Sequence, residues 1–83
     1  MAGFDEVATA LIAGLGGKDN IKHLEPCTTR IRVEVNDEAA IDEPALKATG
    51  AHGVMRRGSV VQVVMGLQSD NIEQVMRRQM EEG

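Results

Sequence analysis

The chain has 83 residues, a net charge of −4 and one cysteine, and these values exclude several classes of protein. A chain this short suits one small domain, because single cores typically organise about 100 to 150 residues. Its acidic surplus argues against nucleic-acid binding, which needs Lys and Arg to displace counterions from phosphates. One cysteine forms neither an internal disulfide nor a tetrahedral zinc site, so we expect a reducing cytoplasm, no metal and no cofactor.

The first predicted element is an amphipathic helix over residues 4–15. Its apolar residues recur at the i, i+3, i+4 spacing, and Gly14, Gly16 and Gly17 then end the helix. The glycines invite comparison with a phosphate-binding loop, but they lack the Walker spacing and the hydroxyl residue that should follow Lys18. A helix end is therefore the better interpretation.

Two strands are then predicted to form an antiparallel hairpin. The first covers residues 20–26, a turn spans residues 27–29, and residues 30–35 are the clearest strand of the chain. Alternation in this second strand separates an apolar face from a charged face, with Ile31, Val33 and Val35 on the first and Arg30, Arg32 and Glu34 on the second. We expect the apolar face to pack and the arginine face to stay open.

A second helix and a second pair of strands follow. The helix is predicted over residues 42–49 with Asp42 as its N-cap. The strands are predicted over residues 54–57 and 60–65, with a tight turn between them. The second of these strands is apolar on both faces apart from Gln62, which is typical of a central strand.

The last predicted element is a helix that Ser69 or Asp70 would cap. The whole order is α-β-β-α-β-β-α. This order predicts an α+β fold, a four-stranded antiparallel sheet with three helices on one face, formed by residues 1–83 as a single domain.

The tip of the first hairpin brings a thiol and two arginines together. Arg30 and Arg32 are two residues apart, about 7 Å along a strand, and Cys27 precedes them in the turn. Cations and backbone N–H groups stabilise a thiolate and also bind a dianion. Phosphoryl transfer needs positioned positive charge more than a proton shuttle, and arginine forks supply it without a metal. The Cys-x5-Arg motif of cysteine phosphatases is excluded, because residue 33 is Val33.

Other interpretations of these residues stay open at this point. Cys27 could be an inert or buried thiol of a ligand-binding domain, or a redox switch in a non-enzymatic regulatory or anion-binding module. His23 and His52 are interpreted as surface or turn residues rather than as bases. Arg56 and Arg57 are interpreted as a solvated hairpin end, with docking of an acidic partner as the alternative.

The sequence around the cysteine resembles a known family. Residues 27–37, together with the Asn-Ile pair at 20–21, are similar to the phosphorylation-site motif of IIB domains in the glucose and N-acetylglucosamine family of the bacterial sugar phosphotransferase system. The similarity extends without a gap over residues 16–71.

The resemblance implies that Cys27 accepts a phosphoryl group from the phosphohistidine of a IIA phosphocarrier protein. It implies transfer to a sugar of the glucose or N-acetylglucosamine class, held by the membrane IIC permease. Arg30 and Arg32 match the two functional arginines of the family, and Thr29 and Gln62 match positions that border its phosphate site. The resemblance also implies a cytoplasmic domain associated with the inner face of the membrane through IIC.

Two departures from the family pattern lie beside the cysteine. Glu25-Pro26 stands where an Asp and a small residue are usual, and Thr28 stands where an aliphatic residue is usual. Thr28 adds a hydroxyl group that could support phosphate binding, and Pro26 removes a backbone N–H and stiffens the approach to the turn. We therefore expect a loop geometry particular to this chain.

Overall fold

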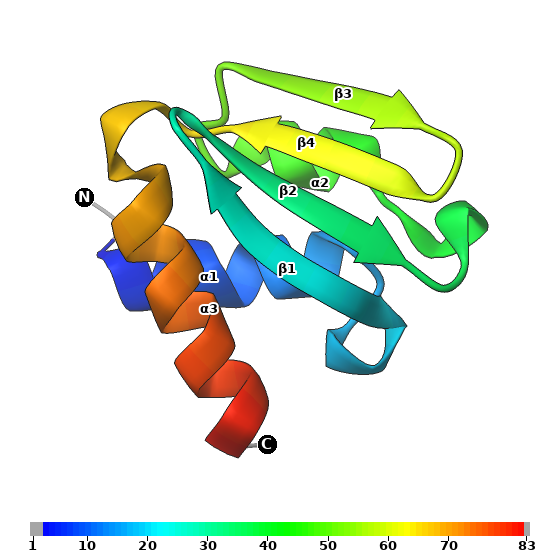
Figure 1. The fold of residues 1–83 in the computed structure, drawn as a ribbon, viewed down its shortest axis with the longest axis horizontal. Coiled ribbons are helices and arrows are strands. Elements are labelled where there is room, and N and C mark those ends of the chain that lie inside the picture. The colour runs from blue at the N-terminus through cyan, green and yellow to red at the C-terminus, as the bar shows by residue number, and fades with distance from the viewer. Residues whose placement is uncertain (1–2, 83) are drawn as a thin grey trace.

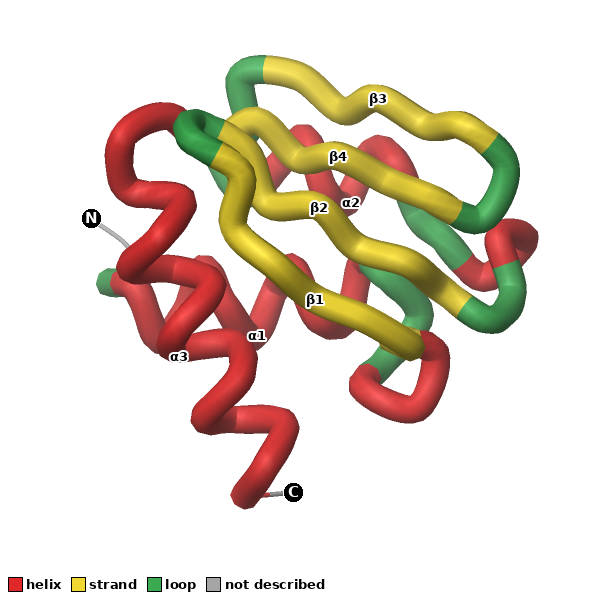
Figure 2. The backbone as a smooth tube through the Cα atoms, viewed as in Figure 1, coloured by secondary structure: helices red, strands yellow, loops and turns green. Residues whose placement is uncertain are grey.

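The fold is built on a four-stranded antiparallel sheet with the spatial order β1-β2-β4-β3, as the computed structural model of residues 3–82 shows (Figures 1 and 2). The strands are β1 (Ile21–Cys27), β2 (Arg30–Val35), β3 (Gly53–Arg57) and β4 (Val60–Val64). The α-helices are α1 (Phe4–Gly14), α2 (Glu43–Ala48) and α3 (Ser69–Glu82), and the short 3₁₀ helices are η1 (Lys18–Asn20), η2 (Glu38–Ala40) and η3 (Gly66–Gln68). The predicted order of elements and the predicted fold class are confirmed.

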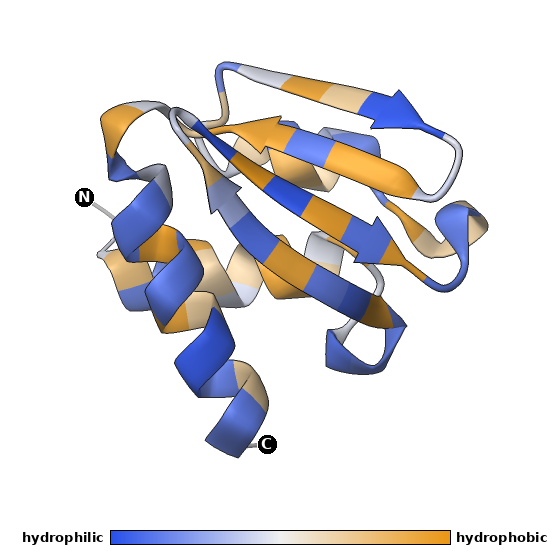
Figure 3. Ribbon diagram, in the orientation of Figure 1, coloured by the Kyte–Doolittle hydropathy of each residue, from blue (hydrophilic) through white to orange (hydrophobic). Residues whose placement is uncertain are grey.

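The three α-helices cover one face of the sheet. Hydropathy alternates along β2 (Figure 3), and its apolar residues Ile31, Val33 and Val35 are the buried ones. The core joins all three helices to β1, β2 and β4 through a set of buried side chains that includes Ala8, Leu11, Leu24, Ile31, Val33, Leu46, Val61, Val63, Ile72 and Met76. No helix in the described part of the chain is long and apolar enough to cross a membrane. The opposite face of the sheet is left uncovered.

A β-bulge near the start of β1 explains an irregular apolar spacing. Ile21 and Leu24 are three residues apart, yet both are buried. The pairing register with β2 shifts between Ile21 and His23, so the strand gains one residue there and both side chains face the core. Beyond the bulge the register is regular as far as Cys27.

Asn20 joins the segment after α1 to the loop after β2 through its buried side chain. Its Nδ2 donates to the carbonyls of Leu15 (2.7 Å) and Asp37 (3.0 Å). Its Oδ1 accepts from the backbone N–H of Asp37 (2.8 Å). Gly16 has a φ of 101°, and a Cβ there would lie 2.6 Å from Nδ2 of Asn20. The loop after α1 is thus shaped around this one amide.

The two predicted helix caps differ in outcome. Asp42 caps α2 as predicted, because its Oδ1 accepts from the N–H of Ala45 (3.1 Å). The prediction for α3 is wrong. The hydroxyl of Ser69 donates to the carbonyl of Gly66 (2.8 Å) instead of accepting, and Asp70 already lies inside the helix. The reason is that η3 leads directly into α3.

Arg77 fastens α3 to the edge strand β1. Its Nη2 donates to the carbonyl of Leu24 (2.6 Å) and also pairs with the buried carboxylate of Glu73. The hydrogen bond and the charge of Glu73 raise the pKa of Arg77 above its usual value. The strand that ends in the cysteine is therefore held from behind by a helix.

Candidate functional site

Cys27 is the last residue of β1, and only Thr28 and Thr29 separate it from β2. The predicted three-residue turn is wrong, because Cys27 is still paired with Arg30 in the strand register. Directly opposite residues of an antiparallel pair project from the same face with Cβ atoms about 5 Å apart. Cys27 is exposed, so the interpretation as a buried thiol is wrong as well.

Thr28 carries backbone strain at the tip of the hairpin. Its φ is 57°, and it is the one non-glycine residue with a positive φ among residues 3–82. This conformation is unfavourable for a β-branched residue, and strained residues of this kind cluster at functional sites. The position directly after the cysteine is therefore held by its surroundings rather than by its own preference.

Replacing Thr28 with glycine is expected to stabilise the domain by about 1 kcal/mol, because glycine adopts a positive φ without a Cβ clash. The matched control is Thr29→Gly, since Thr29 has no positive φ and should lose roughly 0.5 to 1 kcal/mol to the added chain entropy. Urea unfolding of the two variants measures both changes. Destabilisation of the same size in both would show that Thr28 is not strained.

The carbonyl of Thr29 ties the hairpin tip to the end of β4. It accepts from the backbone N–H groups of Met65 (3.2 Å) and Gly66 (2.9 Å). The ring of His52 also lies here, because a Cβ on Gly66 would stand 3.6 Å from Nε2 of His52. Segments distant in the sequence thus fix the loop that follows the cysteine.

Arg30 and Arg32 project from the open face, and each guanidinium group donates to a side chain on a neighbouring strand. Nη1 of Arg30 donates to Oε1 of Gln62 on β4 (3.1 Å). Nη1 of Arg32 donates to Oε1 of Glu25 on β1 (3.0 Å). Gln62 and Glu25 both lie in the residue pairs that contain Arg32, two residues along the strands from Cys27 and Arg30.

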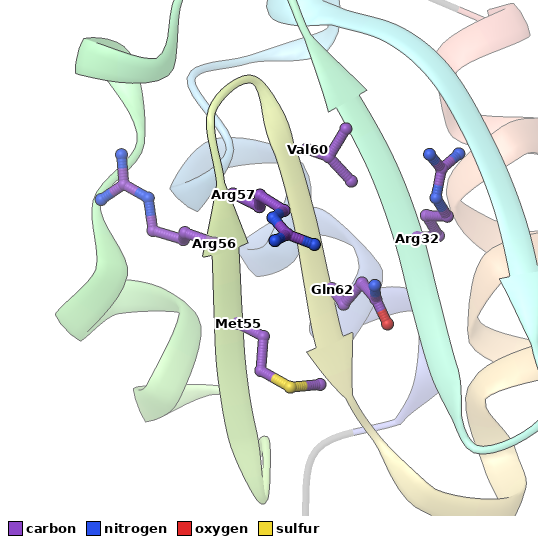
Figure 4. Close-up of a pocket in the computed structure, with 6 residues that line it drawn as sticks. All are labelled: Arg32, Met55, Arg56, Arg57, Val60 and Gln62. Atoms are coloured by element: carbon purple, nitrogen blue, oxygen red, sulfur yellow. The ribbon is translucent and has the colours of Figure 1, made fainter.

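A shallow hollow of about 460 Å³ lies on the open face beside these arginines (Figure 4). It is lined by Arg32, Met55, Arg56, Arg57, Val60 and Gln62. The hollow lies away from Cys27, next to Arg32 and Gln62, which pair across β2 and β4. Cys27 does not line this hollow and is exposed at the surface.

The side chains of the two arginines at the end of β3 point in different directions. Arg57 extends over the open face toward Gln62, whereas Arg56 points away from it (Figure 4). Arg56 pairs with Glu43 of α2 (3.7 Å) and donates to the carbonyl of Glu38 (2.8 Å). Both arginines are exposed, as the interpretation of a solvated hairpin end predicts, but the partners of Arg56 lie on the helical side.

Glu25 is a site residue that the sequence reasoning treated only as a departure from a motif. Its carboxylate lies between Arg32 (3.0 Å) and His23 (3.6 Å) on the open face. Counting outward from a two-residue turn places Glu25 directly opposite Arg32, and the register confirms this pairing. Among residues 3–82, no group of three or more His, Cys, Asp or Glu side chains is placed to hold a metal ion.

Fold and site together define a small α+β protein with a single thiol, which is exposed beside arginines on an open sheet face. The family model of the phosphotransferase system EIIB matches residues 9–42. The N-acetylglucosamine-specific EIIB component of the phosphotransferase system of Streptomyces coelicolor is 55% identical over 65 residues, covering 78% of this chain and 84% of that protein. The crystal structure of one domain of a phosphotransferase system IIabc component from Clostridium difficile matches with a TM-score of 0.74 and 26% identity, over 95% of this chain and 80% of that one.

The chain belongs to the EIIB family of the sugar phosphotransferase system. It is a phosphotransferase component with a phosphocarrier role in sugar transport. The predicted family membership and the predicted enzyme class are confirmed.

Proposed function

We propose that Cys27 is the phosphoryl carrier of this component, in one IIB unit formed by residues 1–83. The observation that carries the proposal is the exposed thiol directly opposite Arg30, at a tip fixed by the carbonyl of Thr29. An exposed sulfur can be reached by a donor protein on one occasion and by a bound sugar on the next. Neither step requires the domain to open.

Two displacements at phosphorus make up the proposed cycle. The thiolate sulfur of Cys27 attacks the phosphoryl group on a histidine of the IIA protein, the N–P bond breaks and an S–P bond forms. A hydroxyl oxygen of the sugar held by IIC then attacks the phosphorus, an O–P bond forms as the S–P bond breaks, and the hydroxyl proton passes to water. The thiolate of Cys27 is thereby regenerated. In this proposal the domain associates with the inner face of the membrane through IIC.

Arginine is the side chain suited to support both displacements. The transition state is loose and spreads negative charge over three oxygens, which planar guanidinium groups neutralise with paired hydrogen bonds. In the proposal, Arg30 and Arg32 turn from their present acceptors to the phosphoryl oxygens. Thr28 and Thr29 border the group at the turn, and the carbonyl of Gln62 orients Arg30.

Incubation with phosphoenolpyruvate, the general phosphotransferase proteins and a cognate IIA tests the proposal. We expect the intact mass to rise by one phosphoryl group, and Cys27→Ser to abolish the increase, because the less acidic serine hydroxyl supplies no comparable anionic nucleophile. Thr28→Ser, which keeps the cysteine, is the matched control and should be labelled as wild type. Equal labelling of Cys27→Ser would refute the assignment, and peroxide sensitivity without any labelling would favour a redox module.

We further propose N-acetylglucosamine as the sugar, because the Streptomyces coelicolor relative is named as specific for it. Membranes that contain the cognate IIC should phosphorylate N-acetylglucosamine when this protein is added. Phosphorylation of glucose but not of N-acetylglucosamine would contradict this proposal and would identify glucose as the sugar.

A further inference from the structure

Glu25 holds Arg32 in a place where a phosphoryl group on the neighbouring thiol would also need it. The carboxylate and the guanidinium are 3.0 Å apart, with 44% and 40% of their side chains exposed. Glu25 and Cys27 belong to the same strand, two residues and about 7 Å apart, on the same face. The carboxylate is thus near enough to the sulfur for their charges to interact.

An ion pair this exposed contributes little to folding, because water and salt screen it. Its position is more informative than its strength. A phosphoryl group on sulfur carries up to about two negative charges, by analogy with phosphoserine, and would be repelled by Glu25 while it attracts Arg32. The acid and the phosphoryl group therefore compete for one cation.

We propose that Glu25 is a positioning residue that retains Arg32 beside the free thiol and yields it to the phosphoryl group. By raising the free energy of phosphocysteine, its negative charge favours onward transfer. The proposal rests on Cys27 being the phosphoryl carrier. Glu25→Gln keeps the shape and a hydrogen-bonding oxygen but removes the charge, so both the repulsion and the competition weaken.

The test is the equilibrium between phosphorylated IIA and this protein, read by intact mass at a known ratio of the two. Glu25→Gln is expected to shift the equilibrium toward phosphocysteine on the order of tenfold, the effect of a unit charge at about 7 Å with screening intermediate between a protein surface and water. The shift should shrink as the salt concentration rises. Transfer from phosphocysteine to sugar should slow in parallel.

Glu34→Gln is the matched control. Glu34 lies on the same open face and is also half-buried, but it stands two residues beyond Arg32 along β2 and is therefore farther from Cys27 than Glu25 is. It removes the same charge but leaves the pair of Glu25 and Arg32 intact, so a shift below about twofold is expected. Glu25→Asp keeps the charge and should remain within about twofold of wild type.

Three results would overturn the proposal. The first is an equal shift of the phosphoryl-transfer equilibrium in Glu25→Gln and Glu34→Gln. The second is a shift toward phosphorylated IIA in Glu25→Gln, and the third is an equilibrium that Glu25→Gln leaves unchanged. Each is read against a wild-type protein that is phosphorylated. A wild-type protein that takes up no phosphoryl group would instead refute the carrier role of Cys27, so the two failures are distinguishable.

Discussion

Arg30→Lys is expected to accept the phosphoryl group on Cys27 but to transfer it to sugar about 10²- to 10³-fold more slowly, the usual cost of removing one preorganised donor from a transition state. Lysine keeps the positive charge but offers a point charge in place of a planar fork with two parallel N–H groups. The measurement is the single-turnover rate of sugar phosphorylation by the phosphorylated variant.

Arg57→Lys is the control for Arg30→Lys. Arg57 lies on the same open face and lines the same hollow as Gln62, but it is at the opposite end of the sheet from Cys27. Transfer by Arg57→Lys should stay within about twofold of wild type, because its guanidinium group lies too far from the sulfur to contact the phosphoryl oxygens. Equal losses in both variants would mean that the loss in Arg30→Lys does not come from removing a planar fork beside the thiol.

Asn20→Ala is expected to destabilise the domain by about 2 to 4 kcal/mol, since three hydrogen bonds are lost and buried backbone groups are left without partners. The total stability of a domain of this size is only about 5 kcal/mol or somewhat more, so most of it would be lost. Thermal and urea unfolding measure the change.

Asn36→Ala provides the comparison for Asn20→Ala. Asn36 is exposed and makes a single side-chain hydrogen bond, to the carbonyl of Asp19 (3.1 Å). Water can replace that bond, so the expected loss is below about 1 kcal/mol. A loss at Asn20 as small as the loss at Asn36 would show that the loop after α1 does not depend on the buried amide.

Most of the fold could be predicted because apolar residues recur at the regular spacing of helices and strands. The alternation in β2 identified its buried face without ambiguity, and the spacing in residues 4–15 identified α1 to within one residue at its end. In the site, the position of Arg30 and Arg32 on the open face was predictable, because alternation within a single strand determines it. The strand register also follows from a two-residue turn, so the pairing of Glu25 with Arg32 was within reach.

The remaining features depend on contacts that no local pattern encodes. The bulge at Ile21 is stabilised by packing against the core, and the tie between Thr29 and Gly66 joins segments far apart in the sequence. The directions of the arginine side chains depend on which acceptor each one meets across the strands. The strain at Thr28 was hidden for the same reason, because a β-branched residue has no local preference for a positive φ.

The double hydrogen bond on the carbonyl of Thr29 has a consequence for the rate of the proposed transfer through Cys27. Because Met65 and Gly66 both donate to it, the loop after Cys27 cannot fray without breaking the end of β4 at the same time. The conformational search that would bring a flexible nucleophile into line is completed when the chain folds, and it is not repeated at each encounter. In the proposed cycle, a donor protein or a sugar would therefore have to find only its own orientation.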